Sequence, residues 1–260
     1  MKAVWSWILE LCELEREVSI EEGAQALTDL GLEVESIERL GQDVRGVVVA
    51  EVVAKQKHPN ADKLTLVQVR DSASGPPTDV VCGAANVPEP GGLVIWAKPG
   101  ASLPGGFEIG SKKLKGIESA GMLCAEDELG ASDDHGGIIV LDEPAELGTD
   151  ARTVLHLEQV VFDIGIPANR ADCLGHVGLA RELVAAIGGR MRPWQNPLDP
   201  LTDVSLATEK LLDIEIRDPG ACPRYVARVI DRLTGGRSPR WMPQRLRAVG
   251  VRPLCGLVAV

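Results

Sequence analysis

Aromatic residues are scarce in this chain of 260 residues, at 3% of the total. Proteins that bind single-stranded nucleic acids without sequence preference stack successive bases on aromatic side chains, and this chain has few such platforms. Hydrophobic residues still reach 45%, so the core must be built from Val, Leu, Ile and Ala. No apolar run is long enough for a signal or membrane segment, which predicts a cytoplasmic protein with no membrane partner.

Paired cysteines are also missing. The six cysteines are scattered, with no Cys-x-x-Cys pair and no histidine pair nearby. This pattern argues against a zinc site and against a disulfide framework, and it favours free thiols in a reducing compartment. We therefore expect no metal ligands in the chain. The cysteines are Cys12, Cys82, Cys124, Cys173, Cys222 and Cys255.

Positive charge is in short supply as well. Lys and Arg together number 27 against 38 Asp and Glu, a net charge of −11. Even residues 41 to 150 hold 9 basic and 17 acidic residues, a net of −8. A protein this acidic is not a general nucleic-acid coat protein, so any RNA contact must come from a local basic patch and be of modest affinity.

The first forty residues predict two helices and a strand. Apolar residues from Trp5 to Cys12 recur at the spacing of one buried helical face. Ser19-Ile20-Glu21-Glu22 has the capping-box pattern of a second helix, which Gly31 is placed to end. Residues 32–37 then alternate as a strand. A unit of this size is too small to be stable alone and needs a partner.

That partner is predicted after residue 150. Residues 160–166 read as a strand, and residues 177–187 mark a helix that Gly188-Gly189 ends. This second unit is also too small to stand alone. We therefore expect residues 1–40 and 151–195 to pack together as one split α/β domain, with residues 41–150 inserted between them.

The inserted stretch is rich in short β-branched runs separated by Gly, Pro and Asp clusters, which suits a small closed sheet. Asn86-Val87-Pro88 and Lys98-Pro99-Gly100-Ala101 are expected as loops at its rim. The runs are Val47–Val53, Leu66–Val69, Val80–Cys82, Leu93–Ala97 and Ile138–Leu141.

Two segments within this stretch carry the functional signal. Lys57-His58-Pro59-Asn60-Ala61-Asp62-Lys63-Leu64 lies between two β-rich runs, where Pro59 and Asn60 favour a turn. Lys112-Lys113-Leu114-Lys115-Gly116-Ile117-Glu118-Ser119-Ala120-Gly121-Met122 places three lysines within four residues, which suits a phosphate backbone. A lysine-rich loop that merely solvates a β domain would show the same charges.

In this order and spacing, the two segments resemble the motifs of the tRNA-binding domain family, which forms an oligonucleotide/oligosaccharide-binding (OB) barrel. The resemblance implies that a His-Pro-Asn-Ala-Asp-Lys-Leu turn follows the first strand and that the lysine segment comes late in the barrel. It predicts that both lysine-bearing turns lie on one RNA-facing side. The RNA-binding residues that it implies are Lys57, His58, Asn60, Lys63, Lys98, Lys112, Lys113, Lys115 and Ser119.

Three patterns imitate catalytic sites, and none of them predicts a catalytic residue. Gly105 to Lys112 lacks the Gly-Lys-Ser/Thr ending of a phosphate loop. Asp133-Asp134-His135, flanked by glycine, is more typical of a solvated turn than of acid/base or metal chemistry. His58, beside a proline in a turn, favours a positioning or surface role over that of a general base.

A second resemblance lies at Pro167-Ala168-Asn169-Arg170-Ala171-Asp172-Cys173-Leu174 and at Gly178-Leu179-Ala180-Arg181-Glu182. Both are similar to motifs of the β subunit of bacterial phenylalanyl-tRNA synthetase, although Ile166 replaces that family's Thr and Ala168 interrupts its Pro-Asn pair. From the residues alone, Asn169 and Asp172 would cap the following helix.

The last sixty residues resemble the opening of the same subunit's editing domain. Pro193 to Pro200 reads as a linker, and residues 212–216 and 222–229 read as neighbouring strands. Ser238-Pro239 then starts a helix that Gly250 stops. We expect residues 200–260 to be the start of a truncated editing domain.

The resemblance implies an α+β protein in which the OB barrel interrupts a small α/β domain. The full family enzyme is a heterotetramer with an α subunit, and it joins phenylalanine to tRNA using ATP and magnesium. No cofactor and no catalytic activity are expected of this chain alone, because the aminoacylation site belongs to the α subunit. Two alternatives remain open, namely a stand-alone tRNA-binding or chaperone-like module and a barrel that docks onto protein.

Overall fold

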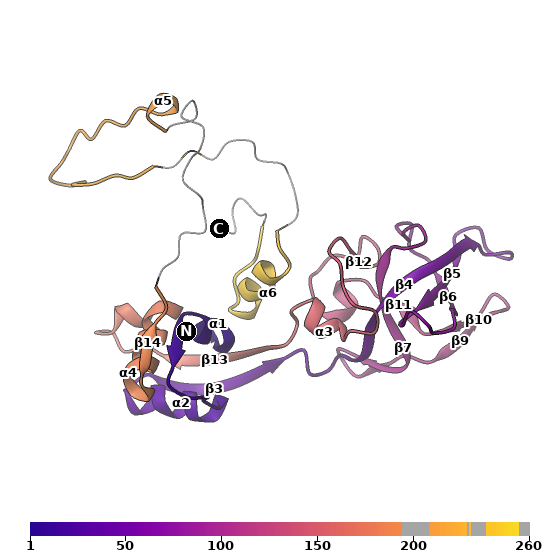
Figure 1. The fold of residues 1–260 in the computed structure, drawn as a ribbon, viewed down its shortest axis with the longest axis horizontal. Helices are drawn as coiled ribbons and strands as arrows, with labels where there is room; N and C mark the ends of the chain where they lie inside the picture. The colour runs from indigo at the N-terminus through magenta and orange to yellow at the C-terminus, as the bar shows by residue number, and fades with distance from the viewer. Residues whose placement is uncertain (194–207, 228, 230–237, 255–260) are drawn as a thin grey trace.

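The structure is a computed structural model that describes residues 1–193, 208–227, 229 and 238–254. Figure 1 shows a mixed α/β protein with two groups of elements side by side. The N-terminal unit comprises residues 1–40 and 158–193, and the sheet unit comprises residues 41–157. Strands β3 and β13 lead from one unit to the other (Figure 1).

The N-terminal unit is organised around a three-stranded antiparallel sheet of order β1-β13-β3. Its core joins both chain segments, because Trp5, Ile8 and Leu27 pack with Phe162, Leu179 and Leu183. The elements are β1 (Lys2–Val4), α1 (Trp5–Glu10), β2 (Cys12–Leu14), α2 (Ile20–Asp29), β3 (Glu33–Leu40), β13 (Gln159–Gly165), η2 (Ala171–Cys173), α4 (His176–Ile187) and β14 (Gly189–Met191).

Local sequence signals account for the ends of α2. The Ser19 hydroxyl accepts a hydrogen bond from the Glu22 amide at 3.2 Å, which satisfies one of the free N–H groups of the first turn. At the other end, Gly31 adopts a φ of 82° and donates to the carbonyl of Thr28. Glycine is suited to this left-handed conformation because it has no Cβ.

The sheet unit contains a seven-stranded sheet of order β11-β7-β4-β5-β6, with β8 and β12 also paired to β7. The sheet curls into a half-barrel, and a separate hairpin of β9 and β10 lies next to β6. The elements are β4 (Arg45–Lys57), β5 (Thr65–Arg70), β6 (Thr78–Cys82), β7 (Leu93–Leu103), β8 (Phe107–Glu108), β9 (Ser111–Leu114), β10 (Ile117–Ala120), β11 (Met122–Leu123), η1 (Asp127–Leu129), β12 (Val140–Leu141) and α3 (Ala151–Val154).

Strands β4 and β7 are buried on both faces. Val49 and Ile95 belong to one hydrophobic cluster, whereas their chain neighbours Ala50 and Val94 belong to another. Successive side chains of a strand point to opposite faces, so each face must contact a separate core. This explains why both strands read as continuous apolar runs rather than as alternating ones.

Three expectations about this region need correction. Lys98 to Ala101 is not a rim loop, because β7 continues through these residues to Leu103. The pairing of β7 with β4 shifts register between Arg45 and Val47, and such an irregularity accommodates a proline within a sheet. Residues 138–141 form only the short strand β12. Finally, residues from 151 onward were expected in the split α/β domain, but Ala151, Leu155 and Leu157 pack into the core of the sheet unit.

Two further elements lie near the C-terminus, namely α5 (Thr208–Leu211) and α6 (Trp241–Ala248). The predicted helix is therefore confirmed as α6, and Gly250 follows it with a φ of 80°. Residues 212–216 form no strand and are exposed, so that prediction is wrong. Residues 222–227 and 229 also form no strand, whereas residue 228 and residues 194–200 of the expected linker lie outside the described residues.

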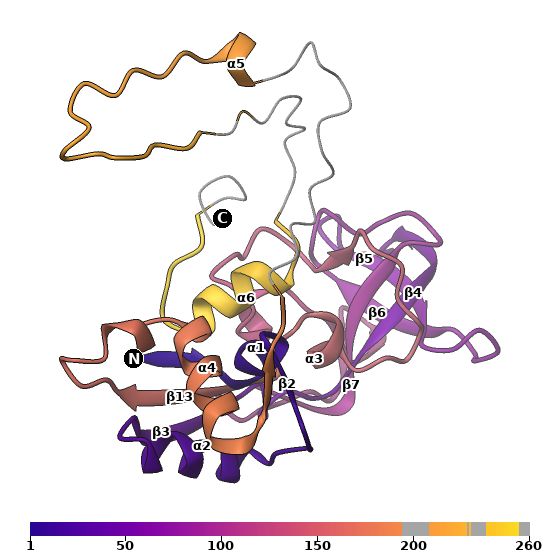
Figure 2. The ribbon, with the colours of Figure 1, turned by 60° about the vertical axis from the view of Figure 1, so that its left-hand side comes forward.

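Helix α6 contacts both units (Figure 2). Arg240 donates to the Val140 carbonyl at 3.2 Å, and Gln244 donates to the Ala131 carbonyl at 2.9 Å, both in the sheet unit. On the other side, Arg245 pairs with Glu10 of α1. No helix in the described part of the chain has the length and apolar character needed to cross a bilayer.

Candidate nucleic-acid interface

The first lysine-bearing segment forms a compact turn after β4. The His58 amide donates to the Leu64 carbonyl at 3.0 Å, and the Leu64 amide donates to the Ala61 carbonyl at 3.1 Å. The His58 side chain is buried, with 4% of its surface exposed, while Asn60 is exposed. The turn therefore directs its polar residues outward around a buried imidazole.

The second segment forms the β9–β10 hairpin, in which Leu114 pairs with Ile117 across a two-residue turn. The two turn residues, Lys115 and Gly116, have φ angles of 49° and 97°. Positive φ at both central positions is the geometry of a type I′ turn, whose twist matches that of the flanking strands. The turn holds the Lys115 side chain at the exposed tip of the hairpin.

Hydrogen bonds join the two segments directly. The His58 Nδ1 accepts from the Asn60 amide at 3.1 Å, and the Nε2 lies 3.2 Å from the Leu114 carbonyl. The tautomer with its proton on Nε2 satisfies both contacts. In addition, the side-chain amide of Asn60 donates to the backbone carbonyl of Lys115 at 3.1 Å. The expectation that the two turns lie together is confirmed, and His58 and Asn60 hold them together.

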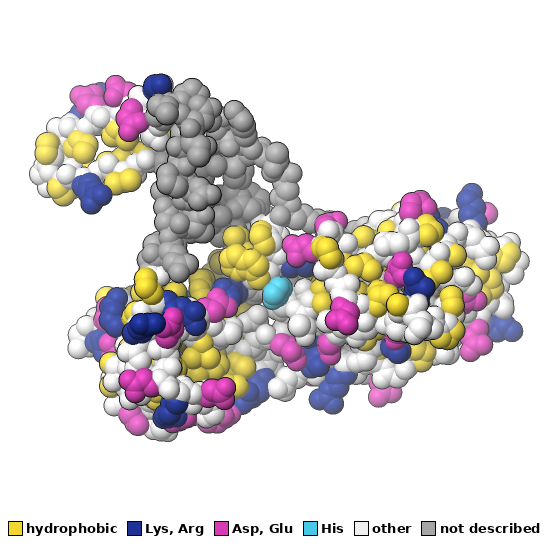
Figure 3. Space-filling model, viewed as in Figure 1, with side chains coloured by type: hydrophobic (Ala, Val, Ile, Leu, Met, Phe, Trp, Pro, Cys, Tyr) yellow, Lys and Arg dark blue, Asp and Glu magenta, His cyan; other side chains and the backbone are white. Residues whose placement is uncertain are grey.

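Five exposed lysines surround this junction. Among the described residues, none of the five takes part in an ion pair, although the exposed Asp62 precedes Lys63 in the chain and Glu118 lies opposite Lys113 across the hairpin. Figure 3 shows dark blue side chains projecting at the end of the molecule where β9 and β10 lie. The five are Lys57, Lys63, Lys112, Lys113 and Lys115.

Lys98 stands apart from these five. Its ammonium group lies 2.7 Å from the Asp71 carboxylate and 5.5 Å from the centre of the Trp96 ring. The side chain is half-buried, and its charge is matched by the aspartate. Lys98 is therefore poorly placed to offer a free charge to a phosphate.

Ser119 is buried, with 2% of its surface exposed. Its hydroxyl accepts from the Val81 amide of β6 at 3.0 Å and donates to the Gly121 carbonyl at 3.1 Å. The contact with Val81 ties the hairpin to β6, and the contact with Gly121 holds the chain that leads from β10 to β11. The sequence suggested an RNA contact for Ser119, but the structure gives it a supporting role.

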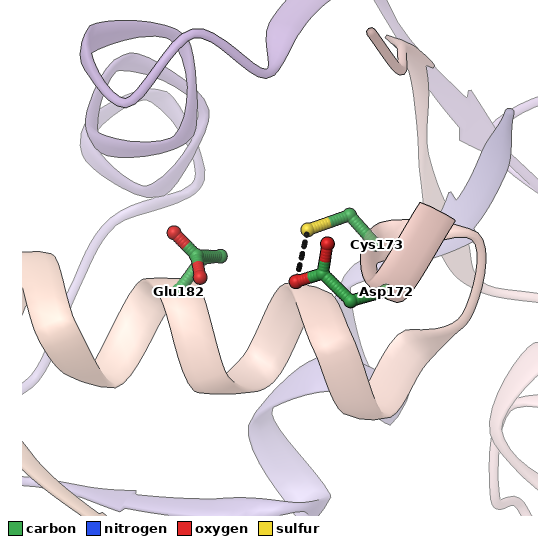
Figure 4. A group of neighbouring side chains, drawn as sticks. All are labelled: Asp172, Cys173 and Glu182. Carbon is green, nitrogen blue, oxygen red and sulfur yellow. Dashed lines mark hydrogen bonds between the residues drawn. The ribbon is translucent and has the colours of Figure 1, made fainter. Parts of the chain in front are cut away.

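A separate polar cluster gathers Asp172, Cys173 and Glu182 near the start of α4 (Figure 4). These side chains have ligand atoms close enough for a metal ion, yet Arg170 lies among them, 3.1 Å from Asp172 and 2.7 Å from Glu182. The guanidinium lowers the pKa of Asp172 to about 2 and contributes the positive charge that a metal would bring. This arrangement is a structural ion-pair network.

The capping role predicted for Asn169 and Asp172 is wrong. Helix α4 begins after Gly175 with no side-chain cap, and the Asp172 carboxylate binds the Arg170 guanidinium instead. The fixed fork of an arginine matches a carboxylate closely, so this contact competes well with a backbone amide.

The acidic turn before β12 likewise forms a surface pair. His135 Nδ1 lies 2.9 Å from the Asp127 carboxylate, and its side chain is exposed. The hydrogen bond with Asp127 raises the pKa of His135, and the same bond lowers the pKa of Asp127. These contacts fit the solvated turn that the sequence favoured.

One residue beside the lysine hairpin carries no signal in either motif. Phe107 of β8 is 55% exposed, and the Lys112 ammonium lies 5.9 Å from the centre of its ring. The low aromatic content of the chain gave no reason to expect a functional ring at this position. A Gly-Gly-Phe sequence just before a lysine cluster was the available signal.

Comparison with known proteins adds an independent finding. A family model described as "Putative tRNA binding domain" matches residues 47–150. The phenylalanine–tRNA ligase β subunit of Fusobacterium nucleatum is 38% identical over 255 residues, which are 98% of this chain and 31% of that protein. The β subunit of Geobacter sulfurreducens is 40% identical over 260 residues, 100% of this chain and 32% of that protein.

A solved structure is also similar in part. The MetRS related protein from Pyrococcus horikoshii is 22% identical, covering 39% of this chain and 84% of that one, with a TM-score of 0.29. That score is too low to support any inference about the fold.

Together, the match and the curled sheet define a protein with a tRNA-binding domain. More particularly, the chain is homologous to the N-terminal part of phenylalanine–tRNA ligase β subunits. It spans about a third of the length of the curated relatives that it matches.

Proposed function

We propose that this chain provides the tRNA-binding N-terminal portion of a phenylalanine–tRNA ligase β subunit. The complete enzyme would join phenylalanine to its tRNA with ATP and magnesium, in a complex with an α subunit that holds the aminoacylation site. We assign no ATP, magnesium or catalytic residue to this chain. We also propose a cytoplasmic location, which the same homology supports.

We further propose that the sheet unit is an OB barrel inserted into a split domain. The separate hydrophobic clusters of the two units support this division. We set the second boundary after Leu157 rather than at residue 151, a choice that the packing of α3 with the sheet supports. Residues 200–260 would correspond to the start of the editing domain, since homology extends over 98% to 100% of the chain.

The observation that carries the RNA-binding proposal is the direct contact between the two lysine-bearing turns. His58 and Asn60 each bond to a carbonyl of the hairpin, so five exposed lysines from segments about fifty residues apart are gathered around one junction. Cations fixed at such a surface bind successive phosphates and release the counterions that those phosphates had condensed. His58 and Ser119 would act by positioning the lysines.

A salt titration of tRNA binding tests this proposal. We would replace Lys112, Lys113 and Lys115 together by alanine and measure tRNA affinity from about 50 to 200 mM salt. The slope of log affinity against log salt should fall by about 1 for each lysine that meets a phosphate. The matched control is Lys98→Ala, which should leave the slope unchanged because Asp71 already neutralises that charge.

Either of two results would refute the proposal. The first is an absence of salt-dependent tRNA binding by the unmodified chain. The second is an equal effect of the triple variant and the Lys98 control, which would place the RNA contact elsewhere. A barrel that docks onto protein would give the first result.

A further inference from the structure

A pocket of about 500 Å³ opens beside the lysine hairpin. Strands β6, β8, β9 and β11 and the loop at 135–138 surround it, and most of its lining side chains are apolar. Its volume falls within the range of about 300–1,000 Å³ that is typical of small-molecule sites. The apolar part of the lining includes Cys82, Phe107, Ile109, Leu114, Met122 and Ile138.

Phe107 lines this pocket and is the exposed aromatic side chain of the sheet unit. Trp96, the other aromatic residue of residues 41–157, is 4% exposed, whereas Phe107 is 55% exposed. Strand pairing fixes its position, because Phe107 pairs with Leu103 of β7 across a turn in which Gly105 and Gly106 both have positive φ. An exposed ring on a paired strand is suited to stacking with a flat ligand.

The lining of the pocket carries charges of both signs. Lys112 lines it, with its ammonium 5.9 Å from the centre of the Phe107 ring, and the other hairpin lysines lie nearby in the chain. Glu108, Glu128 and the exposed His135 also line it. A phosphate would therefore bind at the lysine side, while the uncharged part of a ligand would contact the ring and the apolar lining.

We propose that Phe107 is a stacking platform for one unpaired nucleobase of the bound RNA, with the adjoining phosphate held by Lys112. The inference rests on the proposed tRNA binding and names the contact that this surface makes. Proteins commonly recognise unpaired nucleotides by stacking a base on an aromatic ring while cations hold the backbone. The Phe107 ring supplies the stacking surface, and the Lys112 ammonium, which lies over the ring at 5.9 Å from its centre, supplies the cation.

Three variants at this position separate stacking from simple apolar contact. Phe107→Ala removes the ring, Phe107→Leu keeps an apolar side chain without a π face, and Phe107→Trp keeps a stacking surface. Affinity for unmodified tRNA should fall about 5- to 150-fold in the alanine variant, the range known for loss of one stacked base. The leucine variant should bind nearly as weakly, and the tryptophan variant should bind as the unmodified chain does.

The salt dependence provides the second readout. Stacking releases no counterions, so Phe107→Ala should weaken binding at every salt concentration and leave the slope unchanged. Lys112→Ala should instead reduce the slope by about 1. Thermal unfolding of each variant checks that the fold is kept, as expected for a side chain that is 55% exposed.

Equal affinity of the alanine variant and the unmodified chain would overturn the stacking role, and so would full rescue by leucine. In both cases, salt-dependent tRNA binding by the unmodified chain would leave the proposed function standing. Absence of that binding would overturn both proposals together.

Discussion

His176 at the start of α4 should make the stability of the protein depend on pH. Its Nε2 accepts a hydrogen bond from the Val4 amide at 3.0 Å, and its ring stacks on Trp7 with 4.1 Å between ring centroids. Burial, together with the positive charge of Arg245, lowers the pKa of His176 from its ordinary value of 6.5 to about 4. Arg245 is itself paired with Glu10.

The sign of the effect follows from proton binding. In the unfolded chain His176 takes up a proton as the pH falls through 6.5, whereas in the folded protein it stays neutral down to about 4. The unfolded state therefore binds more protons in this window, and stability falls as the pH is lowered. The full pKa shift corresponds to about 3 kcal/mol of unfolding free energy. Because the ring keeps some exposure to water, we expect a contribution of about 1–2 kcal/mol.

Urea unfolding at several pH values measures this contribution. Replacing His176 by Gln keeps a group that can accept from Val4 but cannot become charged, so the loss of unfolding free energy between pH 6.5 and 4 should shrink by about 1–2 kcal/mol. His135→Gln is the control, since that exposed histidine has a raised pKa and its removal should not flatten the fall. An unchanged pH profile in the His176 variant would refute the reasoning.

Two further predictions concern the supports of the hairpin. Ser119→Ala leaves the buried amide of Val81 without its partner and should lower the free energy of unfolding by about 1–3 kcal/mol, as measured by urea unfolding. Gly121→Ala should destabilise more, because its Cβ would lie 2.1 Å from the Ala97 carbonyl oxygen at a φ of 88°. Gly110→Ala is the matched control, with nothing within 4 Å of the added Cβ, and equal melting temperatures for the two glycine variants would contradict this account.

Elements marked by local signals were predictable from the sequence. Ser19 and Gly31 fixed both ends of α2, and Gly250 fixed the end of α6, because caps act through backbone groups only a few residues away. Strands β4, β5 and β6 and the first part of β7 were equally clear. Their β-branched runs are buried on one or both faces, and that burial is what the pattern records.

Features set by distant contacts were not predictable. The sequence placed a loop at Lys98 to Ala101 because Pro99 and Gly100 disfavour strands, yet the shifted register opposite Arg45 carries β7 through them. Likewise, nothing near Ser119 reveals that its hydroxyl binds an amide 38 residues away.

The candidate site likewise has residues that the sequence identified and residues whose roles depend on distant contacts. The motifs identified its lysines, but they did not separate Lys98, which is neutralised by an aspartate 27 residues away, from the exposed lysines of the hairpin. Phe107 was missed because composition describes how many aromatic residues exist and not where pairing with β7 places one of them.

The central claim is that the two lysine-bearing turns form one RNA-binding surface. Labelling of lysine amines with and without saturating tRNA, followed by mass spectrometry, tests it most directly. The account predicts that tRNA protects all five exposed lysines together and leaves Lys2 of the N-terminal unit reactive. The five are Lys57, Lys63, Lys112, Lys113 and Lys115. Protection of only one turn, or of neither, would contradict it.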